Sequence, residues 1–214
     1  KNTFWDKNKR TICNLGLVAV IFAIMVTIQY TAEPTSMWFS VLRKVCTFTL
    51  AAVSMNLLNG FTGLFSLGQA GFMLLGAYTY AVFTIPTDMR HTVYRNYGDS
   101  LITFQLPLVV GLILAGLVAA FFAWLIGLPV LRLKSDYLAI ATLGFAEIVR
   151  GIVQLQDFGP VTNGPDPINS FTAPKSILVY AAIAGVCIFI IVLLINSTYG
   201  RAFKAIRDDE VAAE

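Results

Sequence analysis

The chain has 214 residues, of which 57% are hydrophobic and 13% are charged, and its formal net charge is +3. A soluble domain of this length could not bury so much apolar surface, so the composition excludes a soluble globular protein and predicts an integral membrane protein. Its three cysteines, Cys13, Cys46 and Cys187, lie in or beside apolar stretches and lack the spacing of metal ligands or disulfides.

Six stretches are apolar and long enough, or nearly long enough, to cross a bilayer, which takes about 20 residues. They cover residues 12–30, 40–59, 67–86, 104–127, 137–155 and 176–196. We therefore predict an all-α fold, a polytopic transmembrane helical bundle of about six spans, as one domain over residues 1–214. An even number of spans places both ends of the chain on the same side of the membrane.

Lysine and arginine are unevenly distributed among the predicted loops. Those that precede the first span, lie between the fourth and fifth, or follow the sixth are Lys1, Lys7, Lys9, Arg10, Arg132, Lys134, Arg201, Lys204 and Arg207. All of these fall on one side, which the positive-inside rule makes cytoplasmic.

Two longer loops then lie outside. Residues 87–103 form a polar surface loop, and residues 156–175 are rich in turn formers such as Asn163-Gly164-Pro165. The second loop should hold a shape without regular structure. It is either a docking surface for a soluble partner or a passive linker.

Residues 56–76 contain five glycines interleaved with Asn, Thr, Ser and Gln. Backbone so rich in glycine does not easily stay helical, and irregular backbone at membrane depth is tolerated only where protein surrounds it or where it lines a watery cavity. The segment is either a broken or re-entrant span beside a translocation path, or a tight cytoplasmic turn followed by a closely packed helix. Its candidate path residues are Asn56, Asn59, Gly60, Ser66 and Gln69.

Small residues recur at every fourth position of the fourth span. They are Gly111, Ala115, Ala119, Ala123 and Gly127. This smooth ridge lets a neighbouring backbone approach closely, so we interpret it as a packing feature.

Glu147 and Arg150 are the charged residues of the fifth span, and at a spacing of three they share a helix face. A charge within the bilayer is costly and should face protein or water. The two side chains either pair with each other while Arg150 reaches toward the outer surface, or one of them lines the path or pairs with another span. Both are therefore candidate path residues.

Several motifs are missing. The chain has no Gly-x-x-x-x-Gly-Lys-Ser/Thr phosphate loop, no nucleophile with a supporting base, and no clustered metal ligands. We therefore predict that it is not an enzyme and binds no cofactor of its own.

The last segment, residues 197–214, is short, charged and helix-forming. Arg201, Lys204 and Arg207 recur every third residue, and Phe203 and Ile206 lie between them. Asp208-Asp209 could cap a following helix that starts at Glu210. The segment is either a basic anchor on lipid headgroups or a helix that fits a groove on a cytoplasmic partner.

Three segments in order, residues 56–80, 131–150 and 199–214, resemble the high-affinity branched-chain amino acid permeases, and specifically their LivM-type subunit. The resemblance implies one permease subunit of an ATP-binding-cassette importer in the cytoplasmic membrane of a bacterium or archaeon. It also implies a second related permease, two cytoplasmic ATPases that bind ATP and Mg²⁺, and an extracytoplasmic binding protein as partners, with no role for nucleic acid.

The resemblance also implies that the tail is the start of the ATPase-coupling segment. Its residues there are Gly200, Arg201, Phe203, Ile206, Arg207, Asp209, Glu210 and Glu214. The family motif continues beyond Glu214 and later spans are expected, which indicates an incomplete permease. Residues 162–167 replace a Gly-Gly turn common in the family, so urea or short amides are alternative substrates. The residues by themselves are also consistent with a channel or secondary transporter that needs no ATPase, or with a helical membrane scaffold.

Overall fold

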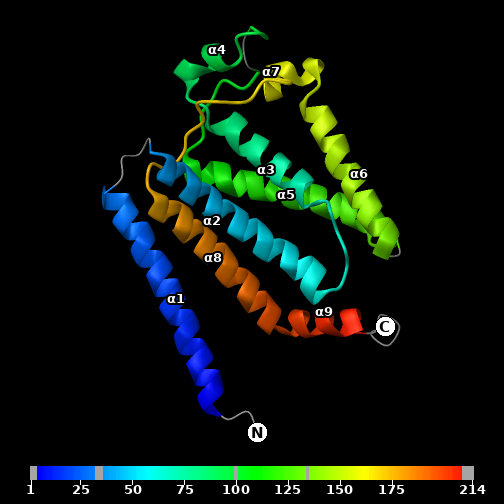
Figure 1. Ribbon diagram of the computed structural model, residues 1–214. Coiled ribbons are helices and arrows are strands. Elements are labelled where there is room, and N and C mark those ends of the chain that lie inside the picture. The colour runs from blue at the N-terminus through cyan, green and yellow to red at the C-terminus, as the bar shows by residue number, and fades with distance from the viewer. Residues whose placement is uncertain (1–3, 32–35, 99–100, 134, 209–214) are drawn as a thin grey trace. The chain divides into compact units, whose positions relative to one another are not determined.

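The computed structural model describes residues 4–31, 36–98, 101–133 and 135–208 (Figure 1). All regular secondary structure within these ranges is helical, as predicted. The chain divides into two compact units. Unit 1 comprises residues 1–54 and 174–194, and unit 2 comprises residues 55–173 and 195–214.

Unit 1 contains α1 (Phe4–Thr31), most of α2 (Met37–Asn56) and most of α8 (Ile177–Asn196). Its core joins one residue from each helix, Met25, Phe39 and Ile177. The backbone N–H of Ile177, which has no partner within α8 because it lies in the first turn, donates to Oε1 of Gln29 on α1 at 2.8 Å. The guanidinium carbon of Arg43 lies 5.5 Å from the centroid of the Phe39 ring. One end of α1 is thereby attached to the starts of α2 and α8.

Unit 2 is built around α3 (Gln69–Thr84), which packs against α5 (Leu108–Val130) and α6 (Ser135–Val153). Glycines allow α5 and α6 to pack closely against α3. A Cβ at Gly111 of α5 would lie 2.6 Å from Cγ2 of Thr84, and a Cβ at Gly71 of α3 would lie 2.9 Å from Cα of Ala146.

The small-residue ridge of α5 is therefore a packing surface at its N-terminal part. Gly111 and Ala115 are buried, whereas Ala119, Ala123 and Gly127 are half-buried within the described chain.

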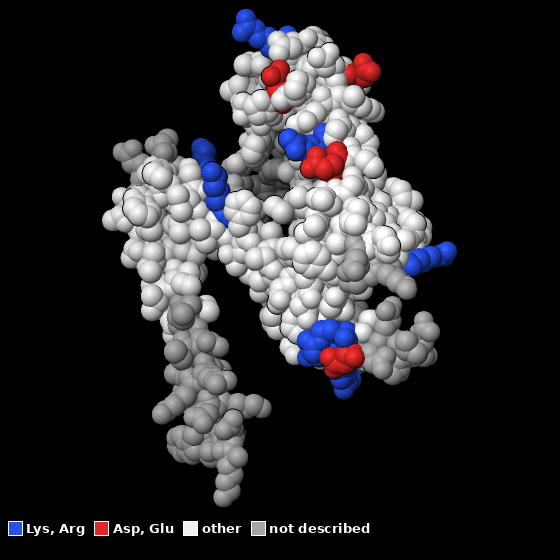
Figure 2. Space-filling model, turned by 45° about the vertical axis from the view of Figure 1, so that its right-hand side comes forward, with Lys and Arg blue, Asp and Glu red and all other residues white. Residues whose placement is uncertain are grey.

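The two predicted external loops fold together into what we call the cap, residues 85–98, 101–106 and 154–173. It contains two single-turn pairs, η2 (Thr87–Met89) with α4 (Arg90–Val93) and η3 (Gln156–Phe158) with α7 (Gly159–Thr162). The cap and α9 (Thr198–Asp208) lie at opposite ends of unit 2 (Figure 1). Figure 2 shows charged side chains at both of these ends and a few between them, on otherwise uncharged surface.

Arg90 joins the cap to the end of α3. It is only 6% exposed and donates to the carbonyl oxygens of Phe104 at 2.7 Å, of Val82 and Ile85 at 3.4 Å, and of Ile102. The Val82 and Ile85 carbonyls lie at the C-terminus of α3, where helical partners run out and the helix dipole favours a cation. The prediction of a simple polar surface loop was wrong at this residue, because a buried guanidinium organises the loop.

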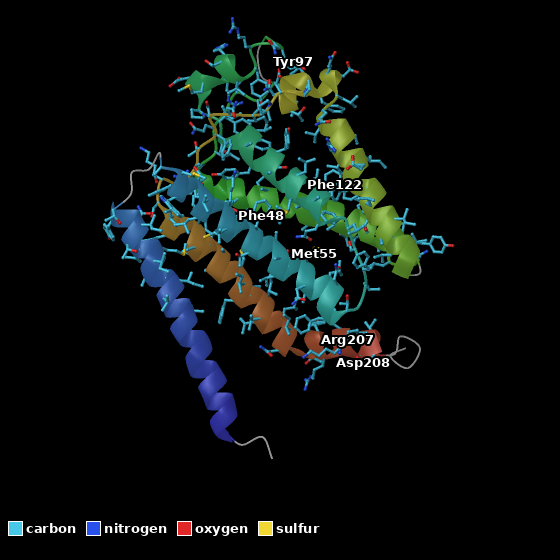
Figure 3. All side chains as sticks on the ribbon, in the orientation of Figure 1. Phe48, Met55, Tyr97, Phe122, Arg207 and Asp208 are labelled. Carbon is cyan, nitrogen blue, oxygen red and sulfur yellow. The ribbon has the colours of Figure 1, made fainter. Side chains whose placement is uncertain are left out.

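Tyr94 and Tyr97 hold the two halves of the cap together. Tyr94 is fully buried and donates from its hydroxyl to the carbonyl of Val161 at 2.8 Å. The ring of Tyr97 (Figure 3) covers Gly159 and Gly164 so closely that a Cβ at either glycine would collide with it. The turn-rich loop thus has a defined shape.

The predicted number of spans was too high. Among the described residues, three helices are long and apolar enough to cross a membrane, namely Met37–Phe61, Leu108–Val130 and Ile177–Asn196. Two bent pairs raise the number to five if each pair is one span: Gln69–Thr84 with Thr87–Val93, bent by 101°, and Tyr137–Val153 with Gln156–Thr162, bent by 61°. In the described part of α1, only Val20–Thr31 is found as a shorter apolar helix.

The physical reason for the first bend is Pro86, which has no N–H and forces extended backbone on the residue before it. Ile85 accordingly has ψ 127° and ends α3. The expected span over residues 67–86 is therefore a 16-residue helix followed by a sharp bend.

Replacing Arg90 with Gln should destabilise the protein by about 3 kcal/mol, because buried carbonyl groups lose a charged donor. The same change at Arg95, which is exposed on the cap, should cost less than about 0.5 kcal/mol. Thermal unfolding of the two purified variants in detergent measures the difference. Equal stabilities would show that Arg90 does not hold the cap.

Candidate functional site

The candidate site is the junction between α2 and α3 together with the helix that lies against it. α2 passes directly into a five-residue π-helical turn, η1 (Leu57–Phe61), and the backbone then stays irregular until α3 begins at Gln69. Gly63 has φ +71°, which L side chains rarely adopt. The prediction that the glycine-rich stretch leaves the helical conformation is confirmed, while its depth in a membrane stays a prediction. Single π-helical turns are rare and occur frequently at functional sites.

Hydroxyl and amide side chains take over the hydrogen bonds of this irregular backbone. Oδ1 of Asn59 accepts from the N–H of Ser66 at 3.2 Å. Oγ1 of Thr142, on α6, accepts from the N–H of Leu67 at 3.0 Å and donates to the carbonyl of Ala139 at 3.0 Å. The junction is therefore attached to α6 and has one defined conformation.

The start of α3 also packs directly on α6. A Cβ at Gly68 would lie 3.1 Å from Cβ of Thr142. The rings of Phe72 and Phe145 have their centroids 5.2 Å apart. This close approach explains why position 68 is a glycine, because a larger side chain would crowd Thr142.

Helix α9 lies against the junction from the other side. Nη1 of Arg207 donates to the carbonyl of Gly60 at 3.4 Å, and Nζ of Lys204 lies 5.6 Å from the centroid of the Phe61 ring. A Cβ at Gly63 would lie 2.8 Å from Cγ of Arg207. The predicted coupling segment and the predicted glycine-rich segment, which are far apart in the sequence, are thus in contact.

The first turn of α9 depends on Gly200. This residue is buried, and a Cβ there would collide with the carbonyl of Ile195. Gly200 therefore allows α9 to begin immediately after α8 ends.

The rest of α9 is largely exposed. Phe203 is half-buried, whereas Arg201, Lys204, Ile206 and Arg207 are exposed. Arg207 and Asp208 form an ion pair at 3.0 Å (Figure 3). The predicted coupling residues Asp209, Glu210 and Glu214 lie outside the described residues.

Glu147 and Arg150 pair with each other at 3.6 Å, as one of the two interpretations expected. Both side chains are more than half exposed, at 63% and 61%, because α6 turns its other face, with Thr142 and Ala146, toward α3. The pair is not brought together with the polar residues of the junction. Whether either residue lines a path stays a prediction.

The remaining path candidates lie at the end of α2 and at the start of α3. Asn56 is exposed, and its side chain lies beside Gly60, where a Cβ would collide with its Oδ1. Gln69 is half-buried in the first turn of α3. Sequence reasoning missed Phe61 and Thr142. The sequence does carry one signal for Thr142, because it is a lone threonine among the apolar residues of the fifth predicted span.

Replacing Thr142 with Val keeps the shape of the side chain but leaves the N–H of Leu67 without its acceptor. We expect amide hydrogen exchange of residues 62–68 to accelerate by about tenfold, the equivalent of about 1.4 kcal/mol. Thr79→Val is the matched control, because the Thr79 hydroxyl donates only to the Leu75 carbonyl within α3 at 2.7 Å. Unchanged exchange in the Thr142 variant would show that this hydrogen bond does not fix the junction.

Comparison with known proteins places these features in a family. Residues 37–214 match the family described as branched-chain amino acid transport system / permease component. No solved structure matches the chain.

Two curated relatives bear the name high-affinity branched-chain amino acid transport system permease protein LivM. The protein of Salmonella typhimurium is 32% identical, and that of Escherichia coli strain K12 is 31% identical. In both cases the similarity covers 77% of this chain, which spans 42% of the relative's length. The apolar helices and the three resembling segments agree with this match. The chain belongs to the branched-chain amino acid transport permease family, whose model matches residues 37–214.

Proposed function

We propose that this chain is a membrane-spanning permease subunit of an ATP-binding-cassette importer and forms part of the translocation path for branched-chain or similar small amino acids. It is a transport subunit without catalytic activity of its own. Family membership supports this proposal, as do the apolar helices of a multi-pass membrane protein.

The observation that carries the proposal is the contact between α9 and η1. A basic helix with an exposed surface rests on the break between two apolar helices, and its Arg207 and Lys204 contact Gly60 and Phe61 directly. A partner that moves α9 therefore acts on the backbone of the glycine-rich junction. Such a contact gives a soluble ATPase a mechanical connection to the membrane part.

The proposed partners follow from this mechanism. Two cytoplasmic ATPases, which hold ATP and Mg²⁺, engage α9, and a second related permease completes the path. An extracytoplasmic binding protein delivers the amino acid to the cap. The separation of the cap and α9 at opposite ends of unit 2 supports this assignment of an outer and an inner side (Figure 1). The proposed location is the cytoplasmic membrane of a bacterium or archaeon.

The junction is the part of the path to which the proposal assigns movement. Its polar groups, Asn59, Ser66 and Gln69, lie where the backbone leaves the helix. Discontinuous helices of this kind form the substrate sites of several transporter folds.

The complete complex in proteoliposomes tests the proposal. Leucine, isoleucine or valine should enter only when binding protein is outside and ATP is inside, because ATP hydrolysis drives the movement of α9. Radiolabelled uptake is the measurement, and vesicles with binding protein but without ATP are the control.

Three outcomes would contradict the proposal. Preferred uptake of urea or short amides would assign the chain to another substrate class. Uptake driven by an ion gradient alone would indicate a secondary transporter or channel. The absence of any transport by the complete complex would favour a scaffold.

A further inference from the structure

The cap contains an open cleft of about 410 Å³, which none of the candidate path residues lines. One wall comes from the segment that follows η2 and the other from the turn-rich loop. The polar residues that line it are Thr92, Arg95, Asn96, Asn163, Asp166, Asn169 and Ser170. Ligand clefts for small molecules are commonly 300–1,000 Å³, so an amino acid fits within this one.

The cleft holds one cation and one anion that do not pair with each other. Arg95 is exposed and forms no ion pair within the part of the chain that the structure describes. Asp166, on the opposite wall, accepts a hydrogen bond through Oδ2 from Nδ2 of Asn96 at 2.8 Å, which leaves its negative charge without a cationic partner among the described residues. Arg95 is the sequence neighbour of Asn96, so both charges belong to the same small region.

Asn163 fixes the shape of the wall that carries Asp166. It is only 3% exposed, and its Nδ2 donates to the carbonyls of Asp166 and Pro167 at 3.4 Å. Its Oδ1 has no hydrogen-bond donor among the described residues. That oxygen is buried from solvent, so it does not form part of the cleft's surface.

Close packing and special backbone angles shape the walls of the cleft. Tyr97 lies over Gly159 and Gly164, beside Asn163, whose φ of +62° lies in the left-handed region. Ser170 has φ +64°; non-glycine residues in this region cost of order 1–3 kcal/mol and cluster at ligand clamps. A preorganised site binds a small polar ligand with less loss of entropy.

We propose that this cleft is a binding site for the zwitterionic head group of a free α-amino acid. The guanidinium of Arg95 binds the carboxylate, for which its planar donors are suited. The carboxylate of Asp166 binds the ammonium group. Val93 and Pro167 are the only apolar residues of the lining, so the site recognises the head group and selects weakly among side chains.

This site lies outside the candidate translocation path and needs neither ATP nor a partner protein to bind its ligand. An experiment can therefore contradict this binding site without contradicting the proposed importer function, and the reverse also holds. Transport by the complete complex can persist in a protein whose cleft binds nothing, and the cleft can bind an amino acid in a protein that does not transport.

The test uses the purified permease in lipid nanodiscs, without ATPase or binding protein. A fluorine-19 reporter is attached to Thr92→Cys in a background without the three native cysteines, and its NMR shift is followed during titration with leucine. Alanine, N-acetyl-leucine and leucine amide are titrated in parallel, because the last two lack the ammonium charge and the carboxylate respectively. We expect saturable shifts with leucine and alanine at similar concentrations, and binding at least tenfold weaker for the two blocked compounds.

Variants assign the binding to the cleft. Arg95→Gln and Asp166→Asn should each weaken leucine binding by at least tenfold, whereas Asp88→Asn, which removes a carboxylate from η2 outside the cleft, should not change it. Thermal unfolding of each variant verifies that the cap is intact, and Arg95→Lys should retain part of the affinity if the charge matters.

Any of three results would overturn the proposal. One is the absence of a saturable shift with leucine. Another is equal binding of N-acetyl-leucine and leucine, which would identify a site for any carboxylate, such as an acidic side chain of a docking protein. The third is undiminished leucine binding in folded Arg95→Gln and Asp166→Asn variants.

Discussion

Backbone N–H and C=O groups that leave a helix in an apolar protein must find partners within the protein, and the architecture depends on this constraint. Side chains meet the requirement at several described breaks. Gln29 accepts from the first N–H of α8, Thr142 accepts from Leu67 in the junction, and Arg90 donates to the last carbonyls of α3. These few polar side chains fix where helices end and which elements they join.

The same constraint gives α9 its significance. The carbonyl of Gly60 lies in η1, and Arg207 supplies it with a donor. The packing between Gly63 and Arg207 leaves no room for even a methyl group. A helix that completes the hydrogen bonding and packing of a break cannot move without changing that break. In the proposed function, this contact is the connection by which an ATPase bound to α9 would act on the membrane part.

The sequence predicts best what depends on local pattern. Helical spacing predicts the Glu147–Arg150 pair, and glycine density predicts the break after α2. It predicts poorly what depends on partners distant in the chain. Arg90 looks like an ordinary loop charge until the carbonyls of α3 surround it, and no local pattern shows that α9 meets η1. One reason that the span count was too high is that the expected span over residues 67–86 contains a helix of only 16 residues, which begins at Gln69 and ends before Pro86.

The central claim is that the contact between α9 and the junction couples ATP hydrolysis to transport. A substitution at Gly63 tests this claim most directly. Gly63→Ala adds a methyl group against Arg207. Gly98→Ala imposes the same kind of backbone strain at φ +81° in the cap, where no side chain of the described residues lies within 4 Å of the added methyl group. Amino acid uptake and ATP hydrolysis are measured together in the complete complex. We predict that Gly63→Ala lowers the uptake per ATP hydrolysed by about tenfold, for a strain of order 1–3 kcal/mol, while the ATPases remain bound and Gly98→Ala transports normally. Equal coupling in the two variants would contradict the account.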